Sequence, residues 1–418
     1  MEDKIRETHR EEIMISIEEF DALEDGAEGA HEFTGEYKRK KEKMLKEGYW
    51  LNKTIIDSLR QTIDKNPDKT ALVSFKVEDQ TEQMFSYQDL WNMTNKIALG
   101  LKQLGVSKND VVSCQLPNWW EFTLLYLACS RIGAVLNPLM PIFRERELEF
   151  MLKHGEAKVF IVPKRFRNFD HEQLANRLKT KIETLQHVVV VNGLEENNFD
   201  RVLVNHGLEQ DSSAVTNLDQ LEARPDDITQ LIFTSGTTGE PKGVMHTANT
   251  LFSNIVPYAE RLHLNQNDVV LMASPMAHQT GFMYGLMMPI ELNAKVVLQD
   301  VWDVSQAVDL IHQHQVSFTM ASTPFLNDLS TTVAEQQNQV SSLKTFLCAG
   351  APIPGSLVQK ARETLGVKVI SAWGMTECGA ITTTRPEDED ERSFNTDGIA
   401  LPGVEIKIVN KAGEIKPL

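Results

Sequence analysis

Cysteine is scarce in this chain of 418 residues, and its four cysteines are scattered with no CxxC pair. This distribution argues against a disulfide framework and against a cysteine-based zinc site. It favours a reducing compartment, in which buried cysteines act as small core residues. We expect that role for all four, which are Cys114, Cys129, Cys348 and Cys378.

Long uncharged apolar runs are also lacking. The stretch Trp119–Leu136 contains Glu121 and Arg131, and the stretch Val269–Leu298 contains two prolines and His278. Neither has the composition of a membrane-spanning helix. The first residues are acidic and do not resemble a signal peptide. The sequence therefore predicts a cytoplasmic protein with no transmembrane segment.

Positive charge is in deficit, since 42 Lys and Arg face 59 Asp and Glu, a net charge of −17. This balance argues against nucleic acid as a partner, because phosphate backbones recruit basic surfaces. Acidic residues concentrate in residues 1–33, which we expect to form a flexible arm. The basic run Lys38–Lys43 is interpreted as a solvated helix face, with a partner-binding patch as the alternative. An anionic substrate must then be held by local donors, a cation or a metal.

Beyond the arm, β-type and helix-type patterns alternate, which predicts an α/β fold with mainly parallel sheets and flanking helices. The expected strands are 70–75, 110–116, 157–162, 187–191, 228–234, 269–273, 295–298, 317–321, 345–349 and 367–372, with a last strand beginning over 404–409. The expected helices include 86–104, 120–133, 251–262 and 305–313.

A polar segment over 209–225 is interpreted as a connection between two lobes. The predicted organisation is therefore an arm over 1–33, a first α/β subdomain over 34–225 and a second over 226–400. The second subdomain is expected to contain the functional site. Residues 401–418 are expected to start a smaller, truncated β subdomain.

The most informative segment runs from Thr234 to Gly243 and is rich in glycine and hydroxyl side chains. Glycines let a backbone approach an anion, and successive N–H groups can surround phosphate oxygens. The pattern differs from a Walker loop, because Lys242 lies between Pro241 and Gly243 and a second short strand follows it, ahead of a helix from about Asn249. The candidate phosphate-binding residues are Thr234, Ser235, Gly236, Thr237, Thr238, Gly239 and Lys242.

Three shorter segments also follow expected strands. Trp373-Gly374-Met375-Thr376-Glu377 combines an aromatic ring, a hydroxyl and a carboxylate, which suits nucleotide binding at the crevice of an open sheet. His278 follows the strand over 269–273, and the small residues Gly350 and Ala351 follow the strand over 345–349. Taken alone, each segment is also compatible with ordinary packing.

The phosphate loop resembles the signature of the adenylate-forming superfamily, which includes acyl-CoA synthetases, peptide-synthetase adenylation domains and firefly luciferase. Trp373–Glu377 is similar to its Y-G-x-T-E motif, with tryptophan in place of the usual tyrosine. The resemblance implies that the loop handles the β- and γ-phosphates of ATP and that Trp373 flanks adenine. It also implies that Thr376 contacts the α-phosphate and that Glu377 is a Mg²⁺ ligand.

By the same resemblance, His278 would lie beside the reacting carboxylate and orient or gate it. Gly350 and Ala351 would lie along the adenine and the acyl-adenylate. The implied reaction activates a carboxylic acid with ATP and transfers the acyl group to coenzyme A. The methionine-rich segment 281–288, with residues 322–325, is a candidate wall of the acyl pocket.

Residues 276–282 contain no aspartate that would pair with an α-amino group, so a short- to medium-chain fatty acid is favoured. An amino-acid adenylation domain is an alternative, and a carrier-protein thiol or a homodimer is left open. The superfamily's Thr-Gly-Asp segment, hinge and C-terminal lysine are not found, and we expect a chain without the C-terminal α+β lid domain. A non-catalytic nucleotide- or acyl-binding module is therefore the other alternative.

Overall fold

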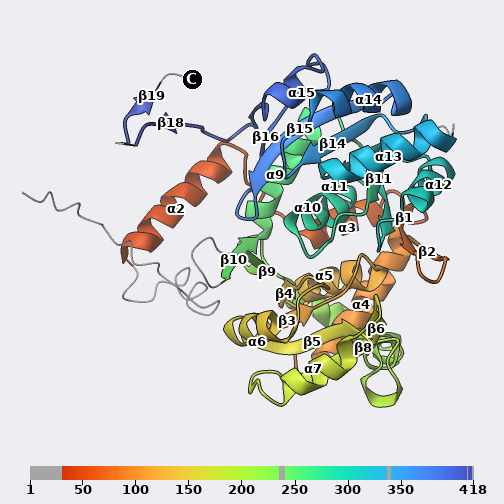
Figure 1. Ribbon diagram of the computed structural model, residues 1–418. Helices are drawn as coiled ribbons and strands as arrows, with labels where there is room; N and C mark the ends of the chain where they lie inside the picture. Colours follow the sequence, from red (N-terminus) through yellow and green to blue (C-terminus); the bar gives the residue numbers. More distant parts are fainter. Residues whose placement is uncertain (1–30, 235–240, 337–339, 412, 417–418) are drawn as a thin grey trace, which may run out of the picture.

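The computed structural model describes residues 31–234, 241–336, 340–411 and 413–416. Two large β-sheets are flanked by helices, and most neighbouring strands run parallel (Figure 1). The α/β class predicted from the alternation is therefore confirmed. The expected acidic arm lies outside the described residues, except for its last three residues, which begin helix α2 (His31–Lys46).

The larger sheet has nine strands. Its six central strands are parallel, and antiparallel strands complete both edges. In spatial order they are β17 (Ile399–Ala400), β16 (Gly379–Thr383), β15 (Lys368–Met375), β14 (Thr345–Ala349), β13 (Phe318–Ala321), β11 (Val269–Met272), β12 (Lys295–Gln299), β1 (Thr70–Lys76) and β2 (Thr81–Ser86).

The smaller sheet has six strands and is parallel except for one hairpin at its edge. In spatial order they are β10 (Lys242–Thr247), β9 (Ile228–Thr234), β4 (Val135–Pro138), β3 (Val111–Cys114), β5 (Ala157–Pro163) and β8 (His187–Val191). Two short ribbons pair β6 (Arg165–Phe166) with β7 (Phe169–Asp170) and β18 (Ile408–Val409) with β19 (Ile415–Lys416). The strand expected from residue 404 is thus limited to β18.

A boundary at residue 225 does not separate the two sheets. Strands β1 and β2 precede this position but belong to the nine-stranded sheet, whereas β9 and β10 follow it but belong to the six-stranded sheet. The segment over 209–225 is docked against the body of the protein, because the buried Arg131 binds Asp219 and Glu222 from it. These two acidic residues hold the segment in place.

Helices cover the outer faces of both sheets (Figure 1). The helix predicted over 86–104 is α4, which begins with a capping box in which the Ser86 and Asp89 side chains each accept the other's backbone N–H. The longer helices are α3 (Ile55–Ile63), α4 (Tyr87–Gln103), α5 (Trp120–Arg131), α6 (Glu145–His154), α7 (His171–Lys179), α9 (Ala248–Arg261), α12 (Val304–His314), α13 (Thr323–Gln336) and α14 (Gly355–Leu365).

The remaining helical segments are short. They are α8 (Ser212–Asn217), α10 (Gln279–Gly281), α11 (Met288–Glu291), α15 (Arg392–Asn395), the 3₁₀ turns η1 (Glu195–Asn197), η3 (Leu208–Gln210) and η4 (Leu218–Gln220), and the π-helical turns η2 (Asp200–Val204) and η5 (Phe282–Met287). Across the described part of the chain, no helix combines the length and apolar character needed to span a bilayer.

Helix α5 is buried on every side, which is typical of a helix in the middle of a large core. One hydrophobic cluster contains α5 together with side chains from both sheets, such as Leu136 of β4 and Leu298 of β12. The two sheets therefore share a core, and the site residues on their edges are held in a common frame.

Glu121 of α5 is buried in this core, and one of its carboxylate oxygens has no hydrogen-bond partner. Desolvation raises its pKa to about 7, although Lys76 lies 3.7 Å away and opposes the shift. A carboxyl whose pKa is raised by folding stabilises the native state at low pH, and that contribution is lost as pH rises from about 4.5 towards 7.

We therefore expect Glu121→Gln to stabilise the protein relative to wild type at pH 8 but not at pH 5. In wild type, Glu121 should make the unfolding free energy lower at pH 8 than at pH 5 by up to about 3 kcal/mol, and this contribution should be absent in Glu121→Gln. Urea denaturation at both pH values measures it. An equal effect of the substitution at pH 5 and pH 8 would show that Glu121 does not titrate in this range.

Candidate active site

The carboxyl ends of β11, β13, β14 and β15 lie along one edge of the nine-stranded sheet, because these strands are parallel neighbours. Gly350 and Ala351 directly follow β14, and His278 follows β11 after a short turn. Trp373 and Gly374 are among the last residues of β15. The sheet thus brings these predicted site residues to a common edge, the usual ligand position in open α/β sheets.

The tight turn between β15 and β16 contains Thr376 and Glu377. Gly374 lies so close to the returning strand that a Cβ atom there would be 2.0 Å from the Gly379 carbonyl oxygen. The absence of a side chain at Gly374 therefore allows this turn to form. Glu377 is exposed, and Trp373 is 47% exposed. An exposed indole on a sheet edge is well suited to stack on a planar ligand.

The backbone that follows β14 at the carboxyl edge of the sheet is also accessible. Gly350 has a φ of +88°, a conformation that favours glycine, and no atom lies within 4 Å of the position a Cβ would take. Ala351 is exposed beside it. Small residues here leave the edge open between β14 and β15.

The predicted phosphate loop joins two paired strands, as expected. Thr234 of β9 and Lys242 of β10 are opposite one another in the antiparallel register, and helix α9 begins at Ala248. The strand–loop–strand–helix order is confirmed. Residues Ser235, Gly236, Thr237, Thr238 and Gly239 lie outside the described residues.

His246 of β10 connects this hairpin to the β15–β16 turn. Its Nε2 lies 2.8 Å from the Thr376 carbonyl oxygen, and its Nδ1 lies 3.1 Å from the Thr250 hydroxyl. A carbonyl can only accept, so Nε2 carries the proton, and the Thr250 hydroxyl shares its one proton between Nδ1 and the Thr247 carbonyl oxygen at 3.0 Å. Burial lowers the pKa of His246, although the bond to Thr376 and the charge of Glu377 oppose this shift. The ring is neutral at pH 7 and fixes the backbone at Thr376.

A second link joins the hairpin to the segment after β11. The buried side chains of Gln230 on β9 and Gln279 on α10 exchange two amide hydrogen bonds of 3.1 and 3.2 Å. Asn118 also holds this segment, donating to the Ser274 carbonyl at 2.9 Å and accepting from the Met276 N–H at 2.8 Å. The turn that presents His278 is thereby attached to both sheets.

His278 begins helix α10, and its Nδ1 accepts the Thr280 N–H at 3.2 Å. Its Nε2 can therefore face a ligand. Desolvation by the surrounding protein lowers the pKa of His278, although part of the side chain is exposed. A neutral imidazole can orient a carboxylate by a hydrogen bond without a net charge.

The methionine-rich segment over 281–288 is buried, and most of it forms the π-helical turn η5. Tyr284 donates to the Asn254 side chain at 2.6 Å and accepts from the Ala380 N–H at 2.8 Å. This segment thus packs directly beneath the β15–β16 turn. π-Helical turns occur frequently at functional sites.

The model of the AMP-binding enzyme family matches residues 59–418. This chain belongs to the AMP-binding enzyme family. The resemblance inferred from the phosphate loop and from Trp373–Glu377 is confirmed.

Two curated relatives illustrate the range of this family. The medium-chain fatty-acid–CoA ligase of Escherichia coli K12 is 33% identical over 89% of this chain, which spans 64% of that relative. The 2,3-dihydroxybenzoate-AMP ligase of Bacillus subtilis 168 is 26% identical over 85% of this chain, which spans 63% of that relative. This chain therefore spans less than two thirds of the length of both relatives.

Among solved structures, the inhibitor-bound N-terminal domain of FACL13 from Mycobacterium tuberculosis is similar, with a TM-score of 0.72 and 22% identity. The match covers 87% of this chain and 86% of that one. At this level of identity the similarity establishes a common fold. The fold of this AMP-binding enzyme is thus that of an N-terminal domain in its family.

Sequence reasoning did not find His246, Gln230, Gln279 or Asn118. None of them stands in a recognisable pattern, and their partners are distant in sequence. Gln230 and His246 are polar residues within the strands β9 and β10, which is a weak indication of a role. Only the fold shows which groups they contact. These residues act by positioning the predicted site residues.

We expect His246→Ala to raise the dissociation constant for ATP by about 10- to 100-fold in isothermal titration, because the Thr376 carbonyl and the Thr250 hydroxyl both lose a buried partner. His246→Gln, which keeps an amide donor, should recover part of the loss. His312→Ala, an exposed histidine on α12, is the matched control. Equal values for His246→Ala and wild type at equal folded fraction would refute the positioning role.

Proposed function

We propose that this AMP-binding enzyme activates a carboxylic acid with ATP, forming an acyl-adenylate and releasing pyrophosphate, and then transfers the acyl group to coenzyme A. The observation that carries the proposal is the His246–Thr376 contact, which attaches the phosphate-loop hairpin to the turn that bears Thr376 and Glu377. A nucleotide lying along this edge would meet both segments at its phosphates.

In the proposed reaction, a carboxylate oxygen attacks the α-phosphorus and the bond to the bridging oxygen of pyrophosphate breaks. No general base is needed, because a carboxylic acid is already ionised at about pH 7. A thiolate then attacks the acyl carbon and AMP leaves. Thr376 would bind the α-phosphate, and Lys242 with the loop residues would bind the departing phosphates.

Mg²⁺ at a phosphate site often takes one or two protein carboxylates and completes its coordination with phosphate and water. The exposed carboxylate of Glu377 fits that requirement. Within the described ranges, no three His, Cys, Asp or Glu side chains are grouped to hold a metal unaided. Glu377 would therefore hold a magnesium ion that arrives with the nucleotide and offsets the negative charge of its phosphates.

The proposed acid is a short- to medium-chain fatty acid. Its support is the identity to the E. coli fatty-acid–CoA ligase, which exceeds that to the dihydroxybenzoate-activating relative. The methionine-rich segment beneath the β15–β16 turn is buried, and an alkyl chain would reach it only through a shift of its flexible methionine side chains. His278 would orient the carboxylate at the edge above it.

ATP–pyrophosphate exchange with a panel of acids tests this proposal. We expect exchange to depend on octanoate or decanoate and to be weaker with 2,3-dihydroxybenzoate and with amino acids. Exchange with aryl acids only would show that the substrate is an aryl acid and not a fatty acid. Exchange with amino acids only would show that the substrate is an amino acid. Wild-type protein that exchanges with no acid would refute the enzymatic proposal for this chain.

A non-catalytic nucleotide- or acyl-binding module is the second candidate. Isothermal titration with a non-hydrolysable decanoyl-adenylate analogue separates the two candidates. Binding without any exchange supports the module, whereas binding with exchange supports the enzyme.

A further inference from the structure

The phenol of Tyr284 closes a ring of three hydrogen bonds with the side chain of Asn254 and the backbone of Ala380. The phenol oxygen accepts the Ala380 N–H at 2.8 Å and donates to Asn254 Oδ1 at 2.6 Å. Asn254 Nδ2 in turn donates to the Ala380 carbonyl oxygen at 2.7 Å. Because a backbone N–H can only donate and a carbonyl can only accept, each bond in the ring has one possible direction. The ring therefore holds both polar groups of one backbone residue.

The hydrogen-bonded ring is adjacent to the turn that contains Thr376 and Glu377, because Ala380 is the second residue of β16. Tyr284, Asn254 and Ala380 are all buried, so bulk water does not compete for these bonds. Burial raises the pKa of Tyr284, although its bond to the Ala380 N–H opposes the shift. The phenol is thus protonated at neutral pH and can donate.

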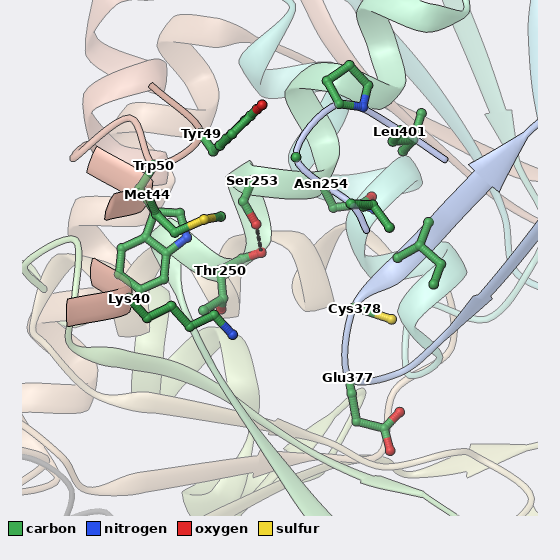
Figure 2. A pocket seen from close by; sticks show the side chains of 14 residues that line it. Lys40, Met44, Tyr49, Trp50, Thr250, Ser253, Asn254, Glu377, Cys378 and Leu401 are labelled. Carbon is green, nitrogen blue, oxygen red and sulfur yellow. Dashed lines mark hydrogen bonds between the residues drawn. The ribbon is translucent and has the colours of Figure 1, made fainter. Parts of the chain in front are cut away.

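A cavity of about 200 Å³ borders this turn on the side of α2 (Figure 2). It is lined by Lys40 and Met44 of α2, by Asn254 of α9 and by Glu377 and Cys378 of the turn, among others. In Figure 2, Lys40 and Met44 lie at the left of the cavity, whereas Cys378 and Glu377 lie at the right. Side-chain packing is incomplete where a cavity lies, so the hydrogen bonds of Asn254 contribute more to holding the turn on this side.

Tyr284 belongs to η5, within the methionine-rich segment that is the candidate wall of the acyl pocket. Its ring stacks on that of Tyr258 in α9, with the ring centroids 4.2 Å apart. The neighbouring Met283 also lies against the turn, since its terminal methyl carbon is 3.0 Å from the position that a Cβ atom of Gly379 would take. Two adjacent residues of η5 therefore reach the strand that follows Glu377.

This arrangement connects the side of the site that would bind the acid with the side that would bind the nucleotide. The methionine-rich segment is buried, so an alkyl chain enters it only if side chains such as Met283 move. Tyr284 would transmit the resulting position of η5 to the backbone at Ala380. When one ligand has already fixed η5 and the turn, the second ligand binds at a lower ordering cost.

We propose that Tyr284 is a positioning residue that couples binding of the alkyl chain to binding of the nucleotide. Resting on the proposed function, the inference adds positive cooperativity between the acid and ATP at that site. The coupling depends on the phenol oxygen, because a phenylalanine ring would still stack on Tyr258 but would bind neither Asn254 nor Ala380.

Isothermal titration of Mg²⁺-α,β-methylene-ATP into the full chain tests the coupling, because the link between the α- and β-phosphorus of this analogue is not cleaved. Saturating decanoate should lower its dissociation constant about 5- to 100-fold in wild type. Acetate, which has the carboxylate but no alkyl chain, should leave the constant unchanged. In Tyr284→Phe, the ratio of the constants without and with decanoate should fall to about one. Asn254→Ala, which opens the same ring from α9, should lower the ratio likewise.

Tyr87→Phe is the matched control, because Tyr87 is also buried and its hydroxyl donates to the Ala294 carbonyl oxygen at 2.8 Å, outside η5 and β16. It should keep the wild-type ratio. A merely structural role for Tyr284 would raise both dissociation constants equally and leave their ratio unchanged. A reduced folded fraction would change the binding stoichiometry and not the ratio. An unchanged ratio in Tyr284→Phe, an equal loss in Tyr87→Phe or a wild-type ratio of about one would overturn the proposal.

This outcome is separable from that of the proposed function. Decanoate-dependent exchange in wild type, with no effect of decanoate on binding of the methylene analogue, would reject the coupling but retain acid activation. An effect of decanoate that requires Tyr284, without any exchange, would reject acid activation but retain the coupling.

Discussion

Glu377→Gln is expected to slow ATP–pyrophosphate exchange about 100- to 1,000-fold. The substitution keeps the size of the side chain but removes the negative charge that would hold magnesium against the phosphates. Because Glu377 is exposed, the fold should be unaffected. Exchange rates at saturating decanoate, with the unfolding midpoint measured in parallel, give the result.

Glu389→Gln is the matched control, because this carboxylate is also exposed and follows the same edge strands. It should exchange at the wild-type rate. Raising magnesium should restore part of the rate in Glu377→Gln, since a weakened metal site fills at higher concentration. Wild-type exchange in Glu377→Gln at low magnesium would exclude Glu377 as the metal ligand.

The second large effect is expected from Gly374→Ala. The new Cβ would lie 2.0 Å from the Gly379 carbonyl oxygen and 2.6 Å from its carbon, so β15 and β16 must move apart. Backbone atoms cannot rotate away as a side chain can, and the turn with Thr376 and Glu377 would shift. We expect binding of the decanoyl-adenylate analogue to weaken at least about 100-fold, because misplaced donors no longer reach the ligand.

Gly366→Ala separates this steric effect from a general cost of replacing glycine. Gly366 has a φ of +70° and open space around it, so alanine there strains only the local backbone. Its cost should be about 1 kcal/mol in stability, with analogue binding unchanged. Gly374→Ala protein that is folded and binds the analogue as tightly as wild type would refute the role of the close strand approach.

Much of the fold could be predicted from local pattern. The strands over 157–162 and 345–349 contain apolar runs of four residues, and the structure places β5 and β14 there within a residue of the predicted ends. The antiparallel strands β2 and β16 were missed. Strand β2 is polar and exposed or half-buried throughout, and the mostly buried β16 is a short Gly-Ala-Ile-Thr-Thr run, so neither has a continuous apolar signal. Membership of a sheet depends on pairing between distant segments, which is why β1 and β9 could not be assigned to their sheets.

The candidate site, like the fold, has parts that the local sequence predicts and parts that depend on contacts between distant segments. The phosphate loop and Trp373–Glu377 are contiguous segments in which several identities act together, so sequence alone identified them. His246 is a single residue whose role depends on the Thr376 carbonyl, which no local pattern indicates. Lys40 was recognised only as part of a basic run, whereas the cavity that it lines depends on the packing of α2 beside α9.

Transfer of oxygen from the acid to AMP tests the central claim most directly. With decanoate labelled by ¹⁸O in both carboxylate positions, plus ATP, Mg²⁺ and coenzyme A, mass spectrometry of the nucleotide product follows the label. Attack of the carboxylate on the α-phosphorus predicts AMP that contains one ¹⁸O atom. Unlabelled AMP, or ADP with labelled inorganic phosphate, would contradict the formation of an acyl-adenylate.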